Sequence, residues 1–352
     1  MITYCNPPAH NPPNHAFLPS SQGETRQAMS SSHGAAHMRA SLTHHMAEAF
    51  EEHNVANELL ESMGVMEEAG LRAMPEQAPP LHPSRARACA MSFIWYSPLG
   101  MGLSQNLKIR ASQILDMSCR VSQEEVERKE AFTAAAAALM IAAKVEPSIK
   151  SPNYDEWSNM CFIASEVSSG VGCGSLTSTE IEVEESQLLR TVSEALAAPT
   201  VLSWLDVFSV RFEVVLQGRT PVEAEDIARV VCRASALASD VVWQTALSDE
   251  QPPFAVALGC FILSLIAEGL IAEQVLCPDG ADWANDIDIV LDAAKAREEQ
   301  RCKQQLCCPL PPRVWGWKDP PRLMFPALLV AAGCDESTAS RATCKVVELL
   351  SC

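Results

Sequence analysis

The sequence is poor in basic residues. Its 352 residues include 26 Lys and Arg against 44 Asp and Glu, which gives a formal net charge of −18. Proteins that bind nucleic acid neutralise phosphates with clustered Lys and Arg, so a direct nucleic acid partner is not expected. The same shortage of positive charge argues against binding to an anionic membrane surface.

Long apolar runs and targeting signals are also missing. The longest apolar run, residues 254–267, is shorter than the roughly 20 residues that a membrane-spanning helix requires, so it predicts a buried core helix. The first residues have neither a basic region nor an apolar stretch, and a secretory signal is not expected. The 14 cysteines form no CxxC pair, which indicates reduced thiols in the nucleus or cytoplasm.

Motifs of catalytic sites are absent as well: the sequence contains no GxSxG, no HExxH and no catalytic Cys–His arrangement. The glycine-rich stretch 170–174 lacks both a preceding strand and the residues that complete a phosphate-binding loop. The histidines near the N-terminus have no carboxylate or cysteine partners that would complete a metal site; they are His33, His37, His44 and His45. We therefore expect no catalytic residue, no metal, no cofactor and no small-molecule ligand.

What the sequence does have is helix-forming residues, and the run 132–147, FTAAAAALMIAAKVEP, is the most informative. A helix that is apolar on every side must be surrounded by other helices. Its five consecutive alanines, 134–138, allow neighbouring helices to approach closely. This predicts an all-α fold with this helix at the centre of a bundle. Lys144 stands at its end, where a cation is favoured by the helix dipole alone.

The helical patterns fall into two sets. We predict a disordered tail at residues 1–36, a first set within 37–200, a second within 201–306, and an irregular segment with a C-terminal helix at 307–352. Nearly fifty residues at about 56–103 separate well-patterned helices of the first set, which predicts an insertion. The second set has its own nearly all-apolar helix, at 254–270.

Local signals predict several helix starts. Ser122 with Glu125, and Thr179 with Glu182, have the spacing of capping boxes, and Thr200 can cap the helix that follows Pro199.

In this order, the motifs resemble those of the cyclin family, across about residues 38–305. Residues 38–42, MRASL, resemble the Met-Arg-Ala-x-Leu that opens the first cyclin box, and Ile114-Leu115-Asp116 resembles the end of its second helix. Residues 142–146, AAKVE, resemble the Ala-x-Lys-x-Glu that ends its third helix. Residues 196–200, LAAPT, are similar to the junction between the two boxes. Within the family, the mitotic A- and B-type cyclins are the most similar.

The resemblance implies tandem five-helix bundles that bind and activate a cyclin-dependent serine/threonine kinase in cell-cycle control. It implies that Lys144 and Glu185, the latter fourteen residues before Pro199, contact the kinase near its regulatory helix. Glu184 is a one-residue alternative to Glu185. We expect the buried Leu139 and Leu188 to support the pair from the core.

Other interpretations stay open. Met38 and Leu42 occupy a surface where some cyclins dock substrates, but His45 stands where that surface normally has tryptophan, which favours a plain core role for both. A nonactivating cyclin-fold scaffold and a TFIIB-like transcription adaptor are alternative functions. The charge of −18 argues against the adaptor, which would require a basic stripe to bind DNA.

Overall fold

The described part of this computed structural model covers most of the chain after residue 56. Its ranges are 57–72, 85–97, 103–118, 127–145, 154–170, 172–193, 195–216, 222, 224–245, 252–271, 287, 289–290, 292 and 324–351.

The described residues form α-helices joined by turns, with no strand among them, which confirms the predicted all-α fold class. In chain order the helices are α2 (Asn57–Arg72), α3 (Arg85–Tyr96), α5 (Gln105–Ser118), α6 (Arg128–Val145), α7 (Tyr154–Gly170), α8 (Ser178–Val192), α9 (Val201–Leu216), α10 (Ala224–Gln244), α11 (Pro253–Ala267), α13 (Met324–Ala332) and α14 (Glu336–Ser351).

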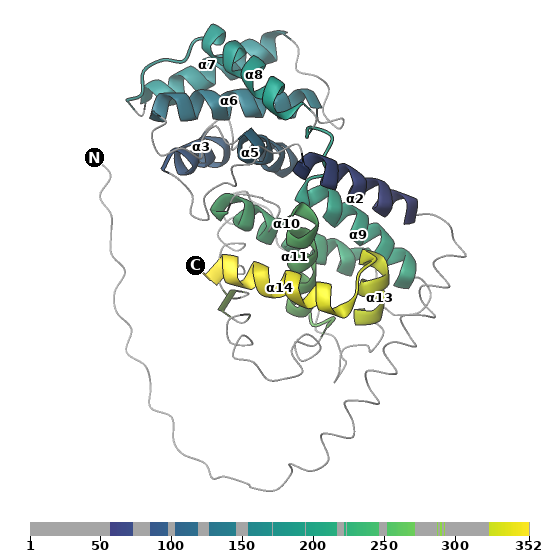
Figure 1. The fold of residues 1–352 in the computed structure, drawn as a ribbon. Coiled ribbons are helices and arrows are strands. Elements are labelled where there is room, and N and C mark those ends of the chain that lie inside the picture. The colour runs from purple at the N-terminus through teal and green to yellow at the C-terminus, as the bar shows by residue number, and fades with distance from the viewer. Residues whose placement is uncertain are drawn as a thin grey trace, which may run out of the picture. The chain divides into compact units, whose positions relative to one another are not determined.

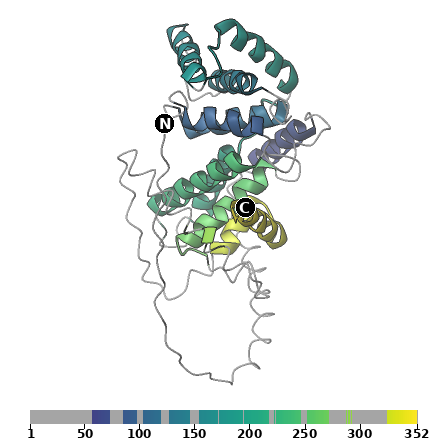
Figure 2. The same cartoon turned by 90° about the vertical axis from the view of Figure 1, so that its left-hand side faces the viewer.

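The alanine-rich helix α6 is the centre of the first helical set. Every side chain from Ala131 to Ala143 is buried, and the helix packs against α3, α5, α7 and α8. Figures 1 and 2 show α6 between the α3–α5 pair on one side and the α7–α8 pair on the other. Alanine has the highest helix propensity and the smallest side chain of the residues used here, so it suits a helix enclosed by neighbours. The predicted central position of this helix is confirmed.

The second set is arranged around α11, which is buried along nearly its whole length and packs against α9, α10 and α14. Gly259 lies where α11 meets α14. A Cβ atom at this position would lie 2.5 Å from the carbonyl oxygen of Ala342 and 2.6 Å from Cγ2 of Val346. The two helices therefore approach as closely as their backbones allow, and only glycine fits at that crossing.

Helices α2 and α3 lie within the segment that sequence analysis describes as an insertion, yet both contribute to the cores. Met91, Phe93 and Ile94 of α3 are buried in the core around α6. Met63 of α2 is buried in the core that also contains α9, α11, α13 and α14. Apolar side chains of both helices are therefore packed among those of the two sets, and the insertion at about 56–103 stays a prediction. The division at 37–200, 201–306 and 307–352 stays a prediction.

Two side chains of α5 donate hydrogen bonds to the junction between the two sets. Arg110 donates to the carbonyl oxygen of Ala198 at 2.6 Å, and the side-chain amide of Gln113 donates to that of Pro199 at 3.2 Å. Thr200 then caps α9, since its hydroxyl accepts from the backbone N–H of Ser203 at 3.1 Å. This confirms the predicted cap at Thr200.

One local prediction is corrected, and one helix was not predicted. The capping box of α8 is formed by Thr177 and Glu180, not by Thr179 and Glu182. The helix α13 has no predicted counterpart; it is apolar throughout and buried against α9. The tail at 1–36, the MRASL motif at 38–42 and the pair Ser122–Glu125 lie outside the described residues.

Candidate functional site

The candidate site lies where the end of α6 meets α8. Lys144, the last but one residue of α6, places its Nζ 2.5 Å from Oε1 of Glu185. The two residues are 41 positions apart in the sequence. The structure therefore brings together the two residues that sequence analysis selects, and it pairs Lys144 with Glu185 although Glu184 was the neighbouring alternative.

The pair is asymmetric in its exposure. The Lys144 side chain is 46% exposed, whereas that of Glu185 is 9% exposed. Leu139 of α6 and Leu188 of α8 are fully buried, as expected for residues that support the pair from the core. Glu185 is thus fixed by its surroundings, while the ammonium of Lys144 stands at the surface where a partner can reach it.

Apolar side chains flank the pair in the sequence and reach the surface. Val145 follows Lys144 and is 37% exposed, and Val183 lies two residues before Glu185 and is 52% exposed. On a helix, residues two positions apart point to opposite sides, so Val183 does not lie on the face of α8 that carries Glu185.

Cys161 of α7 lies within electrostatic reach of the pair. Burial raises the pKa of its thiol, the charges of Glu182 and Glu185 raise it further, and Lys144 acts in the opposite direction. The thiol therefore stays neutral near pH 7 and is not an activated nucleophile.

A second ion pair joins the same two helices. Lys129, near the start of α6, has its Nζ 2.6 Å from Oε1 of Glu180 on α8. The hydrogen bond from Lys129 and those from Thr177 lower the pKa of the Glu180 carboxyl to about 2. Both side chains are more than a third exposed. This pair resembles Lys144–Glu185 in composition and location, and it provides a natural control for experiments.

Sequence analysis missed a buried ion pair that joins the two helical sets. Arg87 of α3 donates from Nε to Oδ1 of Asp116 on α5 at 2.8 Å, and the side chains are 3% and 0% exposed. The same guanidinium donates to carbonyl oxygens at the end of α10, those of Val242, Trp243 and Thr245. Arginine is suited to this role because its planar fork can serve several oxygen atoms at once.

Of the two residues in this ion pair, the sequence pointed to Asp116 but not to Arg87. Asp116 belongs to the family-like Ile114-Leu115-Asp116 motif, but sequence analysis predicts no arginine partner for it. Arg39, like the proposed substrate-docking residues Met38 and Leu42, lies outside the described residues. Within the described part of the chain, the arginine that contacts Asp116 is Arg87.

No helix of the described residues is long and apolar enough to cross a membrane.

Comparison with known proteins supports the interpretation of the first helical set. Residues 60–196 match the family model described as cyclin, N-terminal domain. This range runs from within α2 to the residues after α8, and it includes Arg87, Asp116, Lys144 and Glu185. A search of curated proteins gives no significant match. The cyclin fold is a regulatory and non-catalytic domain family. The match supports assigning residues 60–196 to the cyclin family as a cyclin N-terminal domain.

Proposed function

We propose that the chain is a regulatory subunit that binds and activates a cyclin-dependent serine/threonine kinase, acting in cell-cycle control in the nucleus or cytoplasm. The observation that carries this proposal is the Lys144–Glu185 pair, which the fold assembles at the surface of the cyclin N-terminal domain from two separate helices. The kinase-binding residues are Lys144 and Glu185.

The chemistry of the pair suits contact with a helix of a partner. A lysine ammonium is a donor to backbone carbonyl oxygens, such as those at the end of a helix, and a carboxylate accepts from backbone N–H groups or a basic side chain. Because Glu185 holds Lys144 in place before binding, less side-chain entropy is lost when a partner docks. Val145, the residue after Lys144, is 37% exposed and offers some apolar area near the end of α6.

Activation follows from which kinase conformation the surface binds. A protein kinase positions ATP phosphates with a lysine that must pair with a glutamate of its regulatory helix. A surface that binds that helix only in its inward position shifts the population of kinase molecules toward the active state. The regulatory subunit contributes binding free energy and takes no part in phosphoryl transfer.

The test is binding of the purified full chain to a panel of purified cyclin-dependent kinases, followed by a histone phosphorylation assay. We expect Lys144→Ala and Glu185→Gln each to weaken kinase binding on the order of tenfold, as for a central interface residue. The matched control is Lys129→Ala, which removes a lysine from the same helix and from an ion pair with the same partner helix. It should leave kinase binding unchanged.

Three outcomes decide between the functions. Kinase binding with increased phosphorylation, lost in Lys144→Ala but kept in Lys129→Ala, supports the proposal. Kinase binding without any increase in phosphorylation indicates a nonactivating scaffold. If no kinase of the panel binds, or if Lys144→Ala and Lys129→Ala bind equally well, the assignment of the kinase-binding surface is wrong.

A further inference from the structure

A groove runs between α11 and α14 in the second helical set, outside the matched residues 60–196. Its cavity volume is about 310 Å³. The residues that line it are Ala255, Val256, Thr338, Arg341, Ala342, Lys345, Val346 and Leu349. This volume is near the lower end of the range of about 300–1,000 Å³ for ligand pockets, so the groove suits one or two side chains of a peptide better than a large cofactor.

The floor of the groove is apolar and firmly fixed. Ala342 and Val346 of α14 are 4% and 1% exposed, and Val256 of α11 is 2% exposed. The close crossing at Gly259, one turn along α11 from Ala255 and Val256, holds the two helices together beside the groove. Because these three side chains are almost fully enclosed, the apolar surface that a partner can touch comes mainly from the partly buried Ala255 and Leu349.

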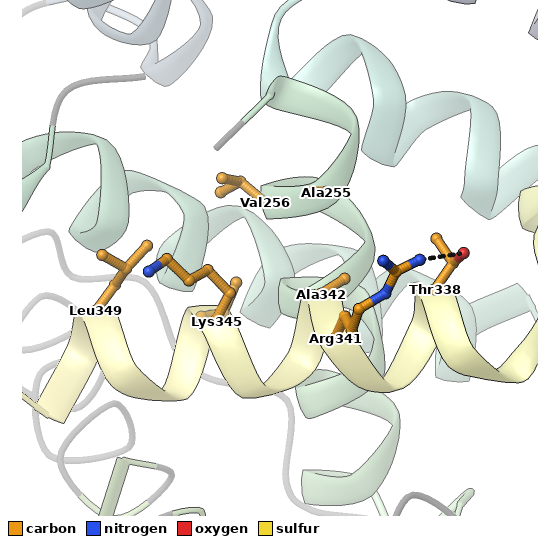
Figure 3. A pocket seen from close by; sticks show the side chains of 8 residues that line it. Ala255, Val256, Thr338, Arg341, Ala342, Lys345 and Leu349 are labelled. Atoms are coloured by element: carbon orange, nitrogen blue, oxygen red, sulfur yellow. Dashed lines mark hydrogen bonds between the residues drawn. The ribbon is translucent and has the colours of Figure 1, made fainter. Parts of the chain in front are cut away.

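The rim of the groove carries two cations of α14. Figure 3 shows Arg341 extending along the helix toward Thr338, while Lys345 extends the other way toward Leu349, with Val256 facing them from α11. Arg341 donates to the Thr338 hydroxyl at 3.4 Å, and Lys345 lies 3.3 Å from Glu348. The residues that α11 contributes to the lining, Ala255 and Val256, are uncharged.

The charge of this rim contrasts with the rest of the chain. Arg341 and Lys345 are one helical turn apart, and like charges at this spacing destabilise a helix slightly. Each cation already has an acidic neighbour outside the lining of the groove, because Lys345 pairs with Glu348 and the charge of Arg341 acts on Asp335. The described lining itself contains these two cations and no acid, so a partner's carboxylates would share or replace those contacts. An apolar floor with a basic rim is complementary to a segment that combines an aliphatic or aromatic side chain with neighbouring carboxylates.

We propose that this groove binds a short acidic peptide segment of a partner protein. One aliphatic or aromatic side chain of the segment packs between Ala255 and Leu349, and carboxylates within a turn of it pair with Arg341 and Lys345. The proposal is independent of the kinase-binding surface, because it rests on α11 and α14 alone.

The experiment is a selection of random twelve-residue peptides displayed on phage, with the full chain as the immobilised target. We expect enriched peptides to contain Asp or Glu within four positions of Leu, Ile or Phe. Binding of the enriched peptides, measured by fluorescence polarisation, should weaken about 2- to 5-fold in Arg341→Ala and in Lys345→Ala, the range for exposed ion pairs. It should also weaken as salt is added.

Two further variants locate the peptide. The double change Arg341→Glu with Lys345→Glu should weaken binding on the order of tenfold or more, and Ala255→Phe, which fills the groove from α11, should abolish it. Lys129→Ala is the matched control, because Lys129 is also a half-exposed lysine in an ion pair. Melting temperatures of all variants verify that they fold.

The proposal is overturned if no peptide is enriched, if the enriched peptides are not acidic, or if their binding is unchanged in the Arg341, Lys345 and Ala255 variants. It is also overturned if light scattering shows a dimer of the chain that these variants dissociate, because the groove then holds a second copy.

Discussion

The buried carboxyl of Glu67 allows a prediction of how the free energy of unfolding depends on pH. It lies between helices from different parts of the chain. Oε2 of Glu67, on α2, accepts from the indole N–H of Trp204 on α9 and from the backbone N–H of Phe254 on α11, the latter at 3.1 Å. Burial raises the pKa of Glu67 from 4.5 to about 7, and these two hydrogen bonds only partly offset that shift. Glu61 lines the same cavity of about 370 Å³ and adds a second carboxylate near the site.

The direction of the pH dependence follows from the raised pKa. Between pH 4.5 and about 7 the folded chain holds a proton on Glu67 that the unfolded chain has lost. The free energy of unfolding therefore falls as the pH rises through this window, and it levels off above pH 7. Raising the pKa from 4.5 to about 7 corresponds to about 3 kcal/mol, since a tenfold change in proton affinity is worth about 1.4 kcal/mol.

The variant Glu67→Gln tests this reasoning. Its amide oxygen accepts the same two hydrogen bonds without a charge, so the variant should lack the fall in stability. Urea unfolding from pH 4.5 to pH 8.5 should show similar stability of the two proteins at the acidic end. At pH 8.5 the variant should be more stable by up to about 3 kcal/mol.

The control is Glu68→Gln, at a neighbouring side chain that is 62% exposed, and it should differ from wild type by no more than about 0.5 kcal/mol at any pH. If wild type and Glu67→Gln lose stability in parallel as the pH rises, the buried carboxyl is not the source of the pH dependence and the reasoning is refuted.

Two further predictions concern stability. Arg87→Ala removes the arginine that pairs with the buried Asp116, so urea unfolding should show a loss of about 3–5 kcal/mol; a loss below about 1 kcal/mol would contradict the buried pairing. Gly259→Ala places a Cβ atom against the backbone of α14 and should lower stability by about 1–3 kcal/mol. Its control, Gly64→Ala in α2, meets nothing within 4 Å and should raise stability by about 0.5–1 kcal/mol. Equal effects of the two glycine changes would contradict the close crossing.

The sequence predicted the central helices because their signal is local. A helix with apolar residues on every face can only be stable when other helices cover it, and both α6 and α11 have this pattern. Capping signals were less decisive. The stretch 177–182, TSTEIE, contains two threonines with a glutamate three residues later, so the local pattern fits twice. The structure selects Thr177 and Glu180, and Glu180 also pairs with Lys129 of α6.

The role of α3 was not predictable from its local pattern. Its segment follows a proline-rich stretch and has a short apolar run, which resembles an insertion more than a core helix. Only packing shows that Phe93 and Ile94 belong to the first core. Likewise, the contacts of Arg87 could not be predicted from neighbouring residues. Asp116 is 29 positions away in the sequence and Val242 is 155 positions away.

By itself, the sequence determined the helical class, the two central helices and the position of Lys144 at the end of one of them. Each of these depends on the order of apolar and polar residues within one helix, and that order can be read from a short stretch of sequence. The tertiary structure alone decided which carboxylate Lys144 meets, which arginine meets Asp116, and where α11 and α14 leave a groove. These depend on how close residues distant in the chain come to each other, and that distance is set by the packing of whole helices.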